Sequence, residues 1–188
     1  MTLRKTIEVV TRLAEKRVVA NYAIAGAVAA LNYIEPMLTE DLDILISLDG
    51  FEKHHSGLLL LGPIEKALAG MGYTQRSDVG YNIEGWPVQF LPVASPLDEE
   101  GLEQAVEVDA AEPDEAPLKA RILRAEHVVA IALKVGRLKD LARIQAFLEQ
   151  DAVDLKRLKN VLERHNLMDG WSAFCLKAGI KNPMTEID

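Results

Sequence analysis

The sequence has few of the features that mark a secreted or membrane protein. Its 188 residues include one cysteine, Cys175, which excludes an intrachain disulfide and a metal site built on paired cysteines. No apolar run approaches the roughly 20 residues that cross a bilayer, and the N-terminus lacks the apolar core of a signal peptide. We therefore expect a cytoplasmic protein, with the thiol buried among Trp171, Phe174 and Leu176.

Positive charge is also scarce. The 29 acidic residues outnumber the 21 basic ones, and the resulting net charge of −8 argues against nucleic-acid binding through a broad basic surface. Basic side chains nevertheless gather in one part of the sequence, so transfer RNA remains open as a partner. This group consists of Lys119, Arg121, Arg124, Lys134, Arg137 and Lys139.

The length fits one domain, or a compact domain with a helical extension. The apolar pattern predicts helices over 2–17, 25–31, 63–69, 125–135, 138–149, 154–165 and 169–178. It predicts strands over 18–24, 42–48, 73–77, 81–83, 88–92 and 122–123. Residues 49–62 are expected to form a loop, and the acidic stretch 98–115 a solvated helix and loop. We predict an α/β (α+β) fold, with a mixed sheet flanked by helices over residues 1–117 and a C-terminal helical bundle over 118–188.

Two carboxylates stand at the head of the most apolar predicted strand. Aspartate is depleted in strands, so packing alone does not account for Asp41 and Asp43 before Ile44. Strand side chains alternate between faces, so both carboxylates project from one face with their Cα atoms roughly 6.5 Å apart. At that separation they can share one Mg²⁺ (or Mn²⁺) ion, which prefers oxygen ligands and keeps positions open for phosphates. The alternative is a capping or loop pair at a strand entrance.

A glycine marks the junction between the first predicted strand and the next helix. Gly26 allows close backbone approach there, and the unpaired amides of a helix start favour an anion such as phosphate. A simple tight turn is the alternative explanation.

In combination, these residues resemble the signature of the nucleotidyltransferase superfamily. That signature is matched by Ala25-Gly26-Ala27, a spacer of 13 residues, and Asp41-Leu42-Asp43-Ile44. Thr39, two residues before Asp41, resembles a narrower pattern of the abortive-infection nucleotidyltransferase-like toxins. The segment from Lys134 through Arg137-Leu138-Lys139-Asp140 is similar to a helical motif that those proteins carry after the core.

The resemblance implies a nucleotidyltransferase-like sheet and the transfer of a nucleoside monophosphate from an NTP to an acceptor hydroxyl. Asp41 and Asp43 would hold the metal, and the amides of Gly26 and Ala27 would bind phosphate oxygens. The remaining nucleotide-binding positions would be Thr39, Lys134, Arg137, Lys139 and Asp140, with the basic ones stabilising charge on the leaving pyrophosphate. The acceptor would be a protein, a transfer RNA or a small molecule.

The sequence departs from the family pattern at three positions. Ala27 replaces a Gly or Ser, Met37 replaces the arginine of the narrower pattern, and Gln89 stands where a third carboxylate is expected. A neutral amide can ligate a metal through its oxygen, but it cannot act as a base. Asn82 and Glu84 are candidates to replace the missing group.

Three interpretations remain. The protein is an enzyme, a catalytically silent member that binds a nucleotide or a partner such as an antitoxin, or an unrelated α/β module.

Overall fold

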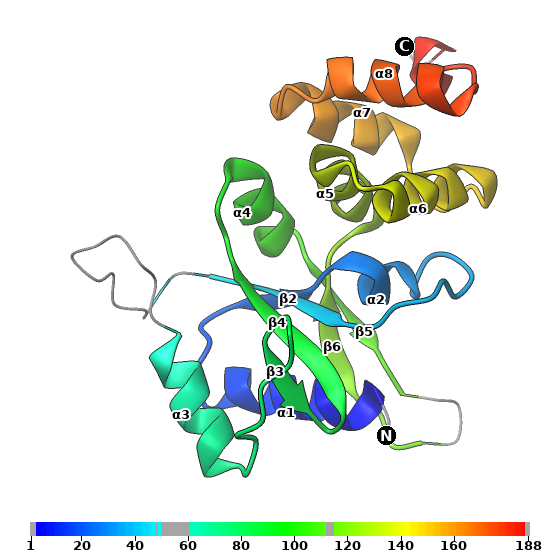
Figure 1. Cartoon of the computed structure of the whole chain (residues 1–188). Helices are drawn as coiled ribbons and strands as arrows, with labels where there is room; N and C mark the ends of the chain where they lie inside the picture. The colour runs from blue at the N-terminus through cyan, green and yellow to red at the C-terminus, as the bar shows by residue number, and fades with distance from the viewer. Residues whose placement is uncertain (1–2, 48, 50–60, 112–114, 187–188) are drawn as a thin grey trace.

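The structure is a computed structural model that describes residues 3–47, 49, 61–111 and 115–186. Most of the loop predicted over 49–62 lies outside these residues. Within them, no helix is long and apolar enough to cross a membrane. The chain forms a sheet with helices on both faces (Figure 1).

The sheet is mixed and has six strands in the order β3-β4-β2-β1-β6-β5. β2 lies between an antiparallel neighbour, β1, and a parallel neighbour, β4, while β6 runs parallel to β1. The strands are β1 (Tyr22–Ile24), β2 (Leu42–Ile46), β3 (Tyr81–Ile83), β4 (Trp86–Pro92), β5 (Val106–Asp109) and β6 (Lys119–Ile122).

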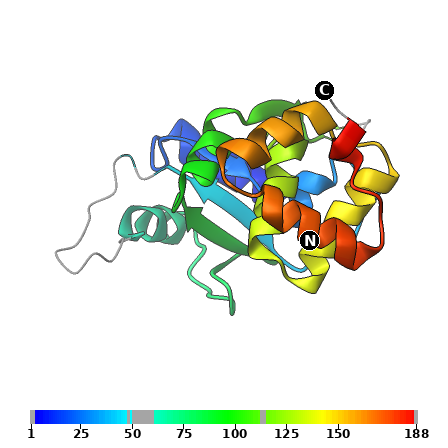
Figure 2. The ribbon, with the colours of Figure 1, turned by 90° about the horizontal axis from the view of Figure 1, so that it is seen from above.

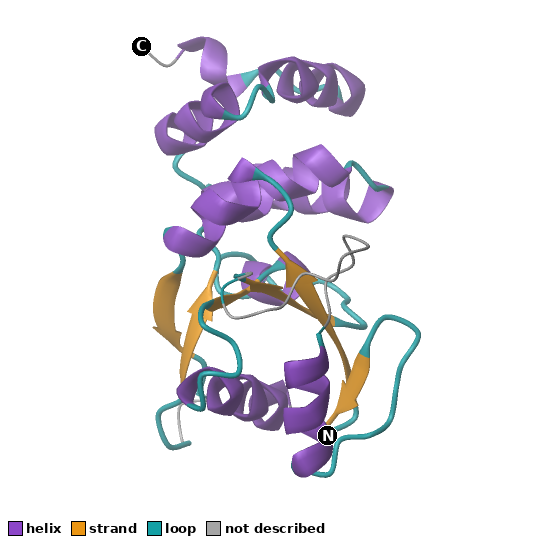
Figure 3. Cartoon of the chain, turned by 90° about the vertical axis from the view of Figure 1, so that its left-hand side faces the viewer, coloured by secondary structure: helices purple, strands orange, loops and turns teal. Residues whose placement is uncertain are grey.

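Helices cover the two faces unequally. In the view of Figure 1, α1 and α3 lie below the sheet, while α2, α4 and the four later helices lie above it; Figure 3 shows the same layers from the side. The α-helices in the described residues are α1 (Leu3–Glu15), α2 (Gly26–Ala30), α3 (Gly62–Gly70), α4 (Pro96–Glu103), α5 (Ala125–Val135), α6 (Leu138–Glu149), α7 (Leu155–Arg164) and α8 (Met168–Ala178). The predicted fold class is thereby confirmed.

The two faces of β2 serve different purposes. Leu42, Ile44 and Ile46 are fully buried on one face, as expected for a central strand. Asp43 and Leu45 point to the opposite face, toward the upper helices, and Asp43 is only partly buried. The face of the sheet that carries Asp43 is thus the one covered by the helical layer, which Figure 2 shows from above.

The predicted helices are all present within a few residues, but several strand predictions were wrong. β1 is shorter than predicted, and residues 73–77 form no strand because only Arg76 makes a bridge, to Tyr81. β6 begins at Lys119, earlier than expected. β5 lies inside the acidic stretch: its apolar and acidic residues alternate, and the strand pairs with β6 at the sheet edge.

The C-terminal helices are mostly as predicted. Cys175 is buried beside Trp171 and Phe174, whereas Leu176 is 85 % exposed, so its predicted contact with the thiol was wrong. The proposed boundary at residue 117 falls just before β6, which belongs to the sheet, and the helical layer begins at Ala125.

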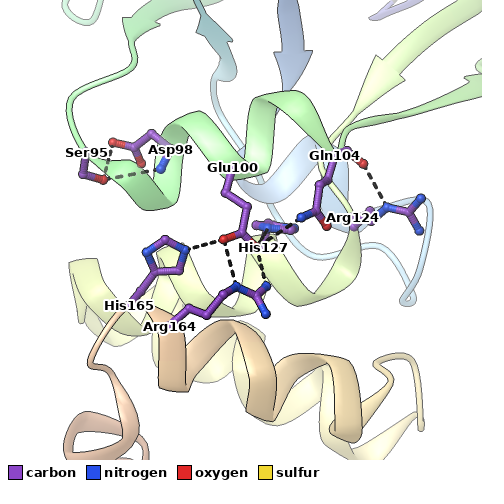
Figure 4. Close-up of polar contacts among 8 residues, drawn as sticks. All are labelled: Ser95, Asp98, Glu100, Gln104, Arg124, His127, Arg164 and His165. Atoms are coloured by element: carbon purple, nitrogen blue, oxygen red, sulfur yellow. Dashed lines mark hydrogen bonds and ion pairs between the residues drawn. The ribbon is translucent and has the colours of Figure 1, made fainter.

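One carboxylate ties the sheet layer to the helical layer. Glu100 of α4 accepts hydrogen bonds from Arg164 at 2.5 and 3.2 Å, from His165 at 2.7 Å and from His127 at 3.2 Å (Figure 4). These bonds, led by those of Arg164, lower the pKa of Glu100 to about 2. The ionised form therefore holds α4 against α5 and α7.

Replacing this carboxylate with an amide should weaken the fold in a pH-dependent way. Glu100→Gln should lower the free energy of unfolding by about 1–2 kcal/mol at neutral pH, a range reduced because Arg164 is half exposed. The folded-state pKa is depressed, so the stabilisation is complete above the unfolded-state value of 4.5 and is lost as the pH falls toward about 2. Urea unfolding followed by circular dichroism over this range measures it.

Glu103→Gln on the same helix is the matched control, since Glu103 has no partner among the described residues. A Glu100→Gln deficit that stays constant down to low pH would contradict the assignment.

Candidate functional site

The two predicted aspartates lie at the beginning of β2. Asp43 is the second residue of the strand and Asp41 immediately precedes it. The Thr39 hydroxyl donates to the carbonyl of Asp41 at 3.0 Å, and the amide of Ala25 donates to the carbonyl of Asp43 at 2.8 Å. The backbone on both sides of the pair is therefore fixed, and Thr39 acts through the main chain.

Gly26 lies directly against Asp43. Its φ is +59°, a left-handed conformation that side chains disfavour. A Cβ atom at this position would overlap the Asp43 Oδ2 atom. Glycine is thus required twice, by the backbone angle and by the carboxylate, and the start of α2 with Ala27 is brought next to β2.

Gln89 also belongs to this group. The parallel register of β2 and β4 pairs Asp43 with Gln89, which places the two side chains on one face of the sheet. The proposed substitutes are placed elsewhere: Asn82 is on β3, separated from β2 by β4, and Glu84 accepts a hydrogen bond from the Tyr73 hydroxyl at 2.5 Å. Neither replaces the third carboxylate, which corrects that expectation.

A buried carboxylate on α6 organises the basic side of the site. Asp140 is 1 % exposed and accepts hydrogen bonds from Arg137 at 2.6 and 3.2 Å. Arg143 also donates a hydrogen bond to Asp140, from Nη1 to Oδ1 at 3.2 Å. The sequence motif pointed to Asp140 and Arg137 but not to Arg143. The signal that could have found it is the spacing of three residues, which puts Arg143 on the same helical face as Asp140.

The acidic and basic groups lie within electrostatic range of each other. Burial raises the pKa of Asp43 above its ordinary value and the adjacent Asp41 raises it further, while Arg137, Lys139 and Arg143 oppose both effects. Neither aspartate side chain has a hydrogen bond or ion pair with another described residue. Among the described residues, no direct contact therefore neutralises the pair.

The donor set fits a hard divalent cation. Asp41 and Asp43 offer carboxylate oxygens, and Gln89 offers an amide oxygen on the same face; Mg²⁺ and Mn²⁺ prefer such ligands. Within the described ranges, no group of three or more His, Cys, Asp and Glu is placed to hold a metal. A cation here would relieve the repulsion that raises the Asp43 pKa.

Lys134 is not brought to this site. Its ammonium donates to Ser95 Oγ at 2.8 Å, at the N-terminus of α4. The wider basic group is dispersed as well: Lys119 pairs with Glu107 at 2.7 Å, and Arg121 bonds Asn21 and the carbonyl of Leu102. The sequence cluster is therefore not one basic surface.

The contact between Gly26 and Asp43 predicts a cost for any side chain at position 26. Gly26→Ala should destabilise the protein by about 1–3 kcal/mol, because the left-handed conformation penalises alanine and the carboxylate must move. Thermal and urea unfolding measure the loss.

Gly70→Ala is the matched control, since an added Cβ there meets no atom within 4 Å. It should be neutral or slightly stabilising. Equal effects of the two substitutions would contradict the close approach.

The buried position of Asp140 predicts a larger effect than that of an exposed carboxylate. Asp140→Asn keeps the shape but leaves Arg143 without a charge partner, and should cost about 2–4 kcal/mol of unfolding free energy. Asp154→Asn, which removes the charge from an exposed pair with Arg157, should cost less than about 1 kcal/mol. Thermal denaturation of both variants tests the difference, and a similar loss in each would count against the anchoring role.

Comparison with known proteins supports the fold and goes no further. No family model and no curated protein matches the chain by sequence. Among solved structures, the antibiotic-resistance factor ANT(2'')-Ia, an aminoglycoside nucleotidyltransferase, is similar in two forms. Its solution structure gives a TM-score of 0.52 at 13 % identity, covering 92 % of this chain and 95 % of the other. Its crystal structure with adenylyl-2''-tobramycin gives a TM-score of 0.52 at 14 % identity, covering 95 % of this chain and 99 % of the other. The chain therefore has a nucleotidyltransferase-like fold over nearly its whole described length.

Proposed function

We propose that the protein is a metal-dependent nucleotidyltransferase, which transfers a nucleoside monophosphate from an NTP to an acceptor hydroxyl. The observation that carries the proposal is the pair Asp41 and Asp43, which has no side-chain hydrogen bond or ion pair with another described residue and faces basic residues held at the start of α6. The fold likeness to ANT(2'')-Ia supports it, since the second structure contains an adenylylated product.

Different residues of the site would bind the phosphates and stabilise the charge of the leaving pyrophosphate. The first amides of α2, at Gly26 and Ala27, have no intrahelical acceptor and would bind phosphate oxygens. Arg137 and Arg143 are oriented by Asp140, so their donors are aimed before substrate arrives. With Lys139 they would offset the negative charge that develops on pyrophosphate.

Asp41 and Asp43 would hold Mg²⁺ or Mn²⁺. When bound, the ion supplies charge to the phosphate oxygens and orients the triphosphate. The acceptor oxygen attacks the α-phosphorus, the bond to pyrophosphate breaks, and the hydroxyl proton leaves to solvent or to the substrate because Gln89 cannot accept it.

A small-molecule hydroxyl is the first acceptor to test. The neighbouring structure holds an adenylylated small molecule, and Lys119, Arg121 and Lys134 of the predicted basic group are held by separate partners, which weighs against a transfer RNA. A protein acceptor, as well as an antitoxin partner of the abortive-infection kind, is a later test.

A second candidate function follows from Gln89. The pairing of Asp43 with an amide leaves the site one carboxylate short, which is suited to nucleotide or partner binding without turnover. This silent member would bind an NTP with Mg²⁺ and transfer nothing.

Calorimetric titration of each NTP with Mg²⁺ tests the site. Asp41→Ala and Asp43→Ala should each weaken binding at least tenfold, because the cation loses a ligand, while Asp78→Ala on an exposed turn should leave it unchanged. No magnesium-dependent binding in the wild type would overturn both candidate functions.

Labelled-NTP transfer then separates the two. Transfer by the wild type to a hydroxyl acceptor supports the enzyme. The silent member is supported if the wild type binds the NTP without transfer and if Gln89→Asp gains transfer.

A further inference from the structure

A cavity of about 360 Å³ lies at the N-terminal end of α5. The aspartate site is near Arg137, beyond the other end of this 11-residue helix, about 16 Å along its axis. The cavity is therefore distinct from the site already described, and its size is within the range of small-molecule sites. Its lining includes Arg124, Glu126, His127, Arg157 and Arg164.

Guanidinium groups converge on this cavity from α5 and α7. Arg124 donates its Nε–H to the carbonyl of Gln104 at 2.9 Å and has no ion pair with a described residue (Figure 4). Within the part of the chain that the structure describes, the side chain of Arg157 has only an exposed pair with Asp154, at 3.4 Å. Both therefore retain donors for an anion, in contrast to Arg164, whose bonds go to Glu100.

A buried imidazole beside the cavity has an unused nitrogen. His127 is 0 % exposed, and its Nε2 contacts Glu100 at 3.2 Å while its Nδ1 has no partner. Its Cδ2 edge faces Gly101 of α4, so Nδ1 is on the opposite edge of the ring. Nδ1 is buried away from solvent, so His127 acts at the cavity through the bond of its Nε2–H to Glu100.

The lining therefore presents two chemistries. Arg124 and Arg157 offer donors suited to a phosphate, and α5 begins there without a side-chain cap, which also favours an anion. The Glu126 carboxylate offers acceptors suited to hydroxyl groups.

We propose that this cavity is a second ligand site, which takes a phosphate monoester of a sugar, such as a sugar phosphate or a nucleoside monophosphate. The phosphate binds Arg124 and Arg157, and the sugar hydroxyls donate to Glu126. The site does not depend on nucleotidyl transfer.

Binding at this cavity should also stabilise the hydrogen bonds of Glu100 that connect the sheet layer to the helical layer. Arg164 and His127 line the cavity and both bond Glu100. A ligand that contacts them holds α4, α5 and α7 together, so it should raise the midpoint of thermal unfolding.

The test uses the full chain in EDTA, so that the aspartate site holds no metal. Glucose 6-phosphate, adenosine 5′-monophosphate and inorganic phosphate are titrated by calorimetry. We expect a sugar phosphate or the nucleotide to bind at least tenfold more tightly than inorganic phosphate, because only the first two carry hydroxyls for Glu126. Which of the two binds better distinguishes the source.

Variants locate the binding. Arg124→Gln and Arg157→Gln should each weaken it at least tenfold and remove the thermal shift, while Glu126→Gln should weaken the sugar ligands but not inorganic phosphate. Arg12→Gln, an exposed arginine on α1 at the other face of the sheet, and Asp43→Ala should bind as the wild type does. Absence of binding at millimolar concentrations, or binding that survives both arginine substitutions, would overturn the proposal.

Discussion

The fold depends on one strand, β2, in which burial in the sheet and a carboxylate side chain have to be reconciled. β2 lies between β1 and β4 and must be apolar to fill the middle of the sheet, yet its second residue is the carboxylic acid Asp43. Ionised carboxylates are costly to bury, so the strand is tolerated only if its first residues open toward solvent or toward opposite charge. The structure meets that demand with a glycine turn on one side and a basic helix start on the other.

The basic side shows how a buried charge is made acceptable. Asp140 is fully inside the helical layer, and two arginines satisfy its oxygens. Such an arrangement adds little net stability compared with an apolar core, but it fixes the direction of the guanidinium groups. The cost in stability is therefore consistent with a functional role, in which orientation matters more than folding energy.

Much of the fold and part of the site could be predicted from the sequence, because the patterns that indicate them lie within short stretches of the chain. The apolar pattern indicated the bounds of α5 and α6, and the spacing of Asp41 and Asp43 on a strand indicated a shared face. The fold class followed from the predicted succession of helices and strands and from the resemblance to the nucleotidyltransferase signature.

What the sequence could not supply depended on pairing between distant segments. β5 is a strand only because β6 lies beside it, and acidic residues hid its alternation. Glu100 belonged to an acidic run, and nothing in that run indicates that Arg164, 64 residues later, would meet it. Lys134 was assigned by motif, but the helix turns its ammonium toward Ser95.

The short connection after α5 has a mechanical consequence. Gly136 ends the helix in a left-handed conformation, and Arg137 follows at once. The helix is a stiff rod with His127 near one end and Arg137 just beyond the other. A tilt imposed at the Glu100 end is carried along the rod and changes the gap between Arg137 and Asp43, so the two ends of α5 cannot be repositioned independently.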